Sequence, residues 1–287
     1  RSTLFPYTTL FRSIGLLEGK MGIVLAFAHL YRHTCNEIYY ECMSELLDDV
    51  LEHVYKGLDV EFTSGFTGIG WGLEYLLQSG FVEGDGIEVC EEIDKKIMTF
   101  DVRRMADTSL ESGLEGLLHY VLIHIRGSKE QLPFDELYFS DLHAKVKTLV
   151  DAGQREDSFL RLGSMYMHWY ETHSMPDYPL DVLQFVGSPV VEQEQIGVSP
   201  LGLKDGLAGL LLKQIADSAY KNKNVQPQLC QCCYSAPLPQ HIAPNFYHTI
   251  HQSAVNKTSF HEYTLLPRMQ KWLIKRLFSS YTTIIIL

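Results

Sequence analysis

Thr63-Ser64-Gly65-Phe66-Thr67-Gly68-Ile69 is the stretch that decides the fold, because the chain repeats its pattern. Further versions begin at Leu17, Glu111 and Lys204, and each contains Gly-x-x-Gly followed by Ile or Leu. The first glycines of successive copies lie 46, 48 and 93 residues apart. A fixed period of this length is the sequence signature of a repeat protein. The motif glycines are Gly19, Gly22, Gly65, Gly68, Gly113, Gly116, Gly206 and Gly209.

The 93-residue interval is close to two periods, which predicts one more copy near residue 160. Residues 159–169 fit this place because they keep Gly163 within an aromatic, apolar run, and we interpret them as a degenerate copy. The repeats then start near residues 15, 61, 109, 157 and 202. A unit of about 47 residues is long enough for a helical hairpin.

Each unit is predicted to contain two kinds of helix. The residues after a glycine motif are apolar on nearly all sides, as in 23–31 and 71–77, which is typical of a buried inner helix. Residues 38–55, 86–98 and 140–152 place apolar and charged side chains on opposite helix faces, which is typical of an outer helix. No segment before residue 225 shows sustained alternation with period two. We therefore predict an all-α fold of repeated hairpins.

The motif glycines stand three residues apart, on one face of a helix, where the missing Cβ lets a neighbouring helix or loop approach closely. Close packing is the main role that we predict for them. They also stand at helix starts, and in a closed ring of hairpins the starts of all inner helices converge at one end. The positive ends of the helix dipoles would then form a pocket for an anion or a thiolate.

Four acids stand at motif positions that would face the mouth of such a ring: Glu18, Glu111, Glu115 and Asp205. Capping is the simpler interpretation, because the helix dipole favours acids in a first turn. The sharper interpretation is an acidic mouth for a basic peptide, or a carboxylate pair for glycoside hydrolysis. Buried structural roles are expected for the histidines on or beside inner helices, which are His29, His119, His124 and His168. His119 is also a candidate for the mouth of the ring.

The formal net charge of −11 argues against a nucleic-acid partner, because neutralising phosphates requires clustered Lys and Arg. A cationic or neutral partner fits better. No stretch approaches the 18 or so apolar residues of a membrane span, so no membrane role is predicted. Cys35, Cys42 and Cys90 lack the spacing of a disulfide framework, which favours buried thiols in a reducing compartment, the cytoplasm.

Both ends of the chain differ from the repeats. Residues 1–13 resemble the translation of a sequencing adapter, so we treat them as non-native and expect the true amino terminus to be missing. Residues 225–287 contain a single acid, Glu262, and no motif copy. We interpret them as a poorly ordered tail, a capping segment or the product of a frameshift. These residues include side chains of the types that bind zinc, namely Cys230, Cys232, Cys233, His241, His248, His251 and His261. Their spacing does not match that of a zinc knuckle, so no metal site is predicted.

Over residues 14–215 the glycine motifs and their surroundings, especially 15–23, 65–72 and 201–209, resemble the lanthionine synthetase C-like (LanC-like) family. The resemblance implies an α/α toroid, or barrel, of hairpins that is incomplete here and occupies residues 14–224. The family's active members use zinc to activate cysteine thiols of a peptide, which add to dehydroamino acids and form thioether rings. The family's zinc ligands are a Cys-His pair just before a Gly-x-x-Gly and a further Cys beside a Trp.

None of the four pairs at the matching positions supplies a thiolate or an imidazole: Leu17-Glu18, Thr63-Ser64, Glu111-Ser112 and Lys204-Asp205. The resemblance therefore implies a protein for the maturation of a ribosomally made peptide by lanthionine-type cyclisation, whose zinc ligands are not found. A precursor peptide or a modifying enzyme would be its partner. Two alternatives stay open, a zinc-free toroid that binds a peptide or a partner enzyme, and a toroid glycosidase that uses the mouth carboxylates.

Overall fold

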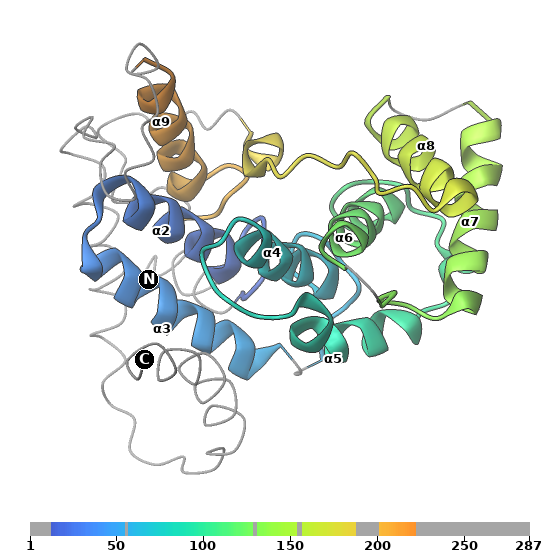
Figure 1. The fold of residues 1–287 in the computed structure, drawn as a ribbon, viewed down its shortest axis with the longest axis horizontal. Coiled ribbons are helices and arrows are strands. Elements are labelled where there is room, and N and C mark those ends of the chain that lie inside the picture. The colour runs from blue at the N-terminus through green and yellow to red at the C-terminus, as the bar shows by residue number, and fades with distance from the viewer. Residues whose placement is uncertain (1–12, 55–56, 129–130, 154–156, 188–200, 222–287) are drawn as a thin grey trace, which may run out of the picture.

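The computed structural model describes residues 13–54, 57–128, 131–153, 157–187 and 201–221, which are helical and contain no strand (Figure 1). This confirms the all-α prediction. The interpretations of residues 1–12 and 225–287, including the tail cysteines and histidines, lie outside the described residues. The helices are α2 (Lys20–Thr34), α3 (Glu37–His53), α4 (Phe66–Gln78), α5 (Gly86–Met98), η1 (Val102–Arg104), α6 (Leu114–Gly127), α7 (Glu136–Asp151), α8 (Asp157–Thr172), η2 (Val182–Phe185) and α9 (Leu207–Lys221).

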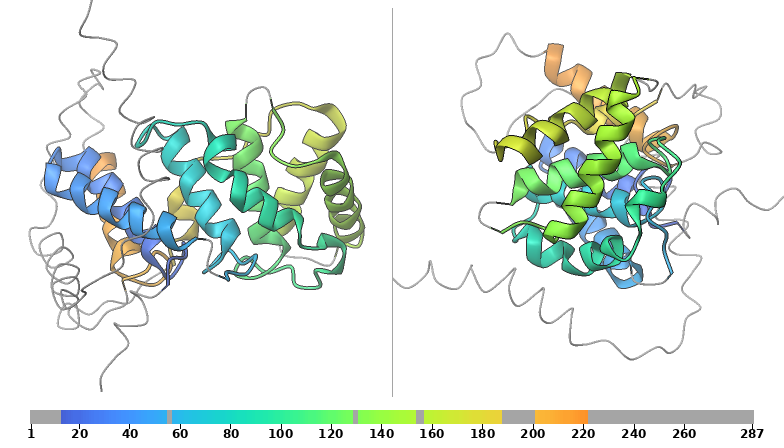
Figure 2. Two further views of the ribbon diagram at one scale, coloured as in Figure 1. Left: turned by 90° about the horizontal axis from the view of Figure 1, so that it is seen from below. Right: turned by 90° about the vertical axis from the view of Figure 1, so that its right-hand side faces the viewer.

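The helices that follow a glycine motif lie side by side. Their packing order is α9, α2, α4, α6 and α8, so the last helix of the described chain packs beside the first. The outer helices α3 and α5 pack against α2 and α4, whereas α7 packs against α8, the helix that follows it. Figure 2 shows α7 and α8 at one end of the molecule and α2, α3 and α9 at the other. In the described part of the chain, this row stays open between α8 and α9.

The predicted difference between inner and outer helices is visible in their burial. Every residue of α4 from Phe66 to Leu76 is buried, whereas α5 buries only Cys90, Ile93, Asp94 and Ile97. The outer helices begin with a side-chain cap: Asn36, Asp85 and Asp135 each accept a hydrogen bond from a backbone N–H of the first turn. The inner helices α2, α4 and α6 begin with glycine and have no side-chain cap. No helix in the described ranges has the length and apolar character needed to cross a membrane.

The degenerate copy is a helix in the expected place, but its start differs from the others. Helix α8 begins at Asp157, six residues before Gly163, whereas α6 begins only two residues before Gly116. A Cβ on Gly163 would come within 2.8 Å of the Val150 side chain, so this glycine serves the contact between α8 and α7. Instead of an outer helix, residues 174–187, which we call the strap, lead from α8 back towards α9 (Figure 1).

Candidate functional site

Each glycine motif is a loop that turns tightly into an inner helix. Gly19, Gly65 and Gly113 are the N-cap residues, with φ from −111 to −123° and ψ from −162 to −167°. On the second glycine of each of the four intact copies, an added Cβ would overlap the carbonyl oxygen six residues earlier; at Gly68 this is the oxygen of Phe62. Close packing at the motif glycines is therefore present, against the loop of the same copy and, at Gly22 and Gly116, also against the Leu203 and Phe62 side chains of another copy.

The loops also use the first amide groups of the inner helices. The N–H groups of Lys20, Phe66 and Leu114 donate to the carbonyl oxygens of the residues seven positions earlier, at 3.1, 2.9 and 3.1 Å. These amides are the unpaired donors that would have faced an anion at the helix start. These three amides are therefore not available to an anion or a thiolate, because the folded-back loops already accept their hydrogen bonds.

Four motif loops meet at one end of the inner helices, through equivalent backbone positions two residues before the first glycine. The N–H of Lys204 donates to the carbonyl of Leu17 at 3.0 Å. Leu17 donates to Thr63 at 3.1 Å, and Thr63 donates to Glu111 at 3.1 Å. We call these bonded loops the loop chain. The starts of α9, α2, α4 and α6 therefore converge, as predicted for inner helices.

Three of the mouth candidates lie around one lysine on the loop chain. Lys204 Nζ donates to Glu111 Oε1 at 2.6 Å. This hydrogen bond, together with the charges of Asp205 and Glu18, raises the pKa of Lys204, and Lys204 in turn lowers the pKa of Glu111. Glu18 and Asp205 are exposed. We call Glu18, Glu111, Lys204 and Asp205 the rim; with three carboxylates and one ammonium group, it has a net negative charge.

The other two mouth candidates are not on the rim. Glu115 and His119 are buried in α6, with 7% and 4% of their surfaces exposed. The Tyr178 hydroxyl of the strap lies 2.6 Å from Nδ1 of His119 and accepts a hydrogen bond from Trp71 Nε1 at 2.8 Å. Burial and the charge of Arg161 lower the pKa of His119 to about 3, so this ring is neutral and accepts from Tyr178.

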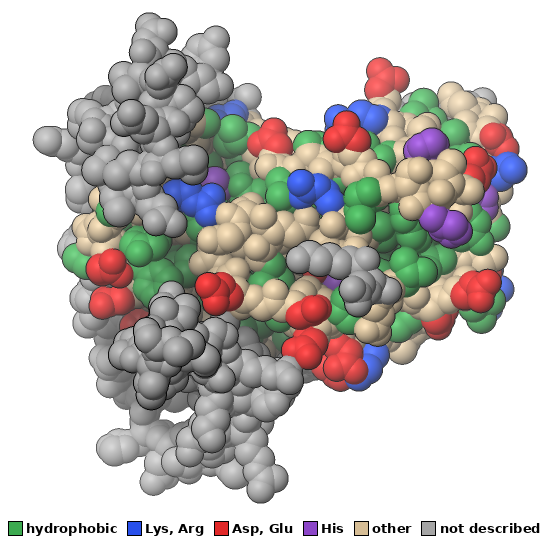
Figure 3. Space-filling model, viewed as in Figure 1, with side chains coloured by type: hydrophobic (Ala, Val, Ile, Leu, Met, Phe, Trp, Pro, Cys, Tyr) green, Lys and Arg blue, Asp and Glu red, His purple; other side chains and the backbone are tan. Residues whose placement is uncertain are grey.

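A surface pocket of about 390 Å³ lies beside the rim, between the loop before α4, the end of α5 and the loop before α6. Ser112, the neighbour of Glu111 in the chain, forms one edge of the pocket. Its lining combines apolar side chains with two acids and one lysine: Leu58, Asp59, Val60, Glu61, Phe66, Lys96, Thr99, Phe100, Met105 and Ser112. Figure 3 shows one face of the molecule, on which acidic groups alternate with exposed hydrophobic side chains and Lys and Arg are scattered.

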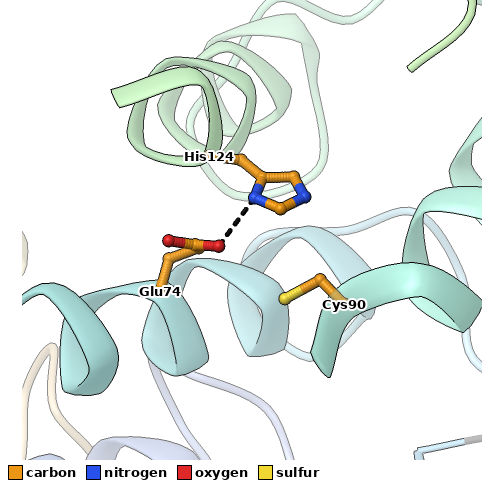
Figure 4. A group of neighbouring side chains, drawn as sticks. All are labelled: Glu74, Cys90 and His124. Atoms are coloured by element: carbon orange, nitrogen blue, oxygen red, sulfur yellow. Dashed lines mark hydrogen bonds and ion pairs between the residues drawn. The ribbon is translucent and has the colours of Figure 1, made fainter. Parts of the chain in front are cut away.

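A second polar cluster is buried between α4, α5 and α6. His124 Nδ1 lies 2.7 Å from Glu74 Oε1, and its Nε2 lies 2.9 Å from Asp94 Oδ2. The Tyr120 hydroxyl donates to Asp94 Oδ1 at 2.6 Å. The Cys90 side chain points towards the same group (Figure 4). We call Glu74, Cys90, Asp94, Tyr120 and His124 the buried cluster.

The electrostatics of the buried cluster follow from its two carboxylates. Burial alone would lower the pKa of His124, but hydrogen bonds to Asp94 and Glu74 outweigh it and raise this pKa to about 9. Burial and the two acids raise the pKa of the Cys90 thiol. Gly86 and Gly127 leave room for the Glu74 carboxylate, because an added Cβ on either would overlap it.

The buried cluster is not predicted as a group by the sequence, which indicates burial only for some of its members. His124 is buried and structural, as expected, and Cys90 is buried. The expectation of burial is wrong for His168 and Cys35, which are exposed, and His29 and Cys42 are only half-buried. His168 lies on the solvent face of α8, and Cys35 follows the end of α2 with φ of 53°. Two features of the sequence could have indicated the cluster: Glu74 lies inside an apolar run, and Asp94 lies on the apolar face of α5.

No family model, no curated protein and no solved structure matches the chain. The helices define an all-α protein with a repeat-like arrangement, and the rim, the pocket and the buried cluster are its candidate sites.

Proposed function

We propose that this chain is a LanC-like α/α toroid whose rim binds a basic, partly apolar peptide segment during the maturation of a ribosomally made peptide. The observation that carries the proposal is the convergence of four motif loops, which collects Glu18, Glu111 and Asp205 around Lys204. Binding is proposed in place of lanthionine-type cyclisation. A cyclase needs a thiolate and an imidazole at these positions, and the chain has none at its four motif copies.

The return of the last repeat supports a ring. In a solenoid each repeat contacts only the repeats before and after it in the chain. Here α9 packs against α2, and the backbone of Lys204 is bonded to Leu17. A fifth copy that packs beside the first is what a toroid requires, and the strap spans the remaining distance between α8 and α9.

The chemistry of the surface supports a peptide as the ligand. The carboxylates of the rim attract cationic side chains, which increases the association rate more than the final affinity. The adjoining pocket offers apolar contact through Leu58, Val60 and Phe100, the last of which is 40% exposed. A segment that alternates Lys or Arg with Leu or Ile would satisfy both surfaces.

The rim is poorly suited to glycoside hydrolysis. That reaction needs one carboxyl group with a raised pKa, which protonates the leaving oxygen. The bond from Lys204 has the opposite effect on Glu111, because it lowers the pKa of this carboxyl. The observed charges therefore favour binding over glycosidase chemistry.

The test uses two synthetic 12-residue peptides, one of Lys and Leu and one of Glu and Leu, labelled for fluorescence anisotropy. We expect the full chain to bind the Lys-Leu peptide at least tenfold more tightly than the Glu-Leu peptide. The double variant Glu18→Gln/Asp205→Asn should weaken binding of the Lys-Leu peptide about fivefold, an effect that shrinks at high salt. Phe100→Ala should weaken it without changing the salt dependence.

The matched control is Glu41→Gln, which removes an exposed carboxylate from the outer helix α3, away from the motif loops. This control should bind the Lys-Leu peptide like the parent. Equal affinity for the two peptides, or equal effects of the rim and control variants, would refute binding at the rim.

A further inference from the structure

The ligand atoms of Glu74, Cys90 and His124 lie within 4.8 Å of one another, although the residues come from three different helices. All three are buried, with exposed fractions of 1% or less. Figure 4 shows the Glu74 carboxylate, the Cys90 sulfur and the His124 ring facing a common point. Carboxylate oxygen, thiolate sulfur and imidazole nitrogen are the ligand types of protein-bound zinc.

The surroundings of His124 have the arrangement that metal-binding histidines require. Such a histidine donates its second ring N–H to a carboxylate, which fixes the ring and its tautomer. Here Nε2 of His124 lies 2.9 Å from Asp94, and Asp94 is held by the Tyr120 hydroxyl at 2.6 Å. The other nitrogen, Nδ1, is left on the side of Glu74 and directed at it.

Binding of a metal ion would require the ligand atoms of His124 and Glu74 to move slightly apart. A separation of 2.7 Å between Nδ1 and Oε1 is that of a hydrogen bond. Ligand bonds of about 2.0–2.1 Å at a tetrahedral angle would place these two atoms roughly 3.3 Å apart. An ion that takes the place of the proton on Nδ1 and the proton on Cys90 Sγ releases both to solvent. The net charge of the cluster is then unchanged, because two positive charges leave as one divalent ion enters.

We propose that Glu74, Cys90 and His124 bind one divalent, thiophilic metal ion, of which zinc matches the ligand set, with Asp94 and Tyr120 as positioning residues. The ion would join the outer helix α5 to the inner helices α4 and α6. Because the ligands are closed off from solvent, the role of this site is to hold the three helices together. The site is separate from the motif loops, where the family resemblance places zinc ligands.

The test is a titration of the full chain, freed of metal by a chelator under reducing conditions, with Co²⁺. We expect uptake of one equivalent, with a thiolate-to-cobalt charge-transfer band. Cys90→Ser should abolish the charge-transfer band. Two matched controls should retain it: Cys42→Ser, on α3 outside the cluster, and the triple variant Cys230→Ser/Cys232→Ser/Cys233→Ser.

The outcomes separate this site from the other cysteines of the chain. Absence of uptake would overturn the proposal, as would a band that survives in folded Cys90→Ser or disappears in the triple variant. Circular dichroism shows whether Cys90→Ser folds. X-ray absorption of the zinc-loaded parent decides the matter if it does not: one sulfur ligand beside nitrogen and oxygen supports the site, and two or more sulfurs contradict it.

Discussion

Lys204 Nζ lies 2.6 Å from Glu111 Oε1, which joins two residues that occupy the same motif position in copies 93 residues apart. The same two residues end the loop chain, since the backbone of Lys204 donates at one end and that of Glu111 accepts at the other. A side-chain bond thus spans the ends of a row of backbone bonds.

The salt bridge between Lys204 and Glu111 is predicted to contribute little to stability. Both side chains are partly exposed, at 35% and 45%, and exposed pairs are worth about 0.2–1 kcal/mol. A double-mutant cycle with Lys204→Met and Glu111→Gln, measured by urea unfolding, should give a coupling energy in this range that decreases at high salt. A coupling above about 2 kcal/mol would mean that the side chains, and not the backbone bonds, hold the loops together.

Gly68→Ala should destabilise the protein by about 2–4 kcal/mol, at or above the usual range for overpacking, because the new Cβ would overlap the backbone oxygen of Phe62. The backbone there cannot move aside, since the adjoining Thr63 belongs to the loop chain. Gly84→Ala is the control, because its Cβ would first meet the movable Leu77 side chain at 3.1 Å. Thermal unfolding of the two variants should differ clearly. Equal melting temperatures would contradict the packing role of the motif glycine.

His119 should make folding stability depend on pH. Its folded pKa of about 3 is below the unfolded value of about 6.5, so the unfolded state binds more protons between these values. Stability is then full above pH 6.5 and is lost as the pH falls towards 3. Between pH 7.5 and pH 5, the contribution is about 2 kcal/mol.

His119→Gln keeps a hydrogen-bond acceptor for Tyr178 but does not titrate. Urea unfolding of parent and variant at both pH values isolates the effect, because His29, whose pKa is lowered to about 4, is present in both proteins. The variant should lose about 2 kcal/mol less than the parent on acidification. Parallel losses would show that His119 is protonated normally in the folded state.

Replacing His124 by Phe in the presence of a chelator should destabilise the protein by about 3–5 kcal/mol, because the carboxylates of Glu74 and Asp94 would remain buried without a positive partner. His29→Phe is the matched control, since His29 is only half-buried and has one hydrogen-bond partner, Tyr75. Differential scanning calorimetry compares the two. A similar, small effect of both changes would contradict a stabilising ion pair between His124 and these two acids.

The repeat pattern was sufficient to predict the helices and the convergence of their starts. The second glycine is required by a backbone geometry that Gly22, Gly68, Gly116 and Gly209 share, so the sequence of these four copies carries the geometry directly. The expected outer helices 86–98 and 140–152 are found as α5 (Gly86–Met98) and α7 (Glu136–Asp151). The pairing of α7 with α8 was not predicted, because periodicity identifies a buried face but not the helix that covers it.

The buried cluster could not be assembled from the sequence. Glu74 and His124 are 50 residues apart and belong to different repeats, so only tertiary packing brings them together. Glu74 and Asp94 each stand out in the sequence as an acid among apolar residues. The sequence does not indicate that these two acids and His124 contact one another. The strap was missed for a related reason: Tyr178 contacts Trp71 across 107 residues, from a segment without helical periodicity.

In the loop chain, backbone hydrogen bonds hold the loops in place, and different groups, the neighbouring side chains, are available to bind a ligand. These bonds run from main chain to main chain and place no demand on side-chain identity, while the next residue in each copy is exposed or half-exposed: Glu18, Ser64, Ser112 and Asp205. Exchange of Ser64 or Ser112 removes a hydrogen bond within the loop, to Glu61 or Asp107, so Glu18 and Asp205 are the positions best suited to exchange. Relatives built on the same glycines could change ligand by substitution at these positions alone, and an engineer could graft a new specificity there without redesigning the scaffold.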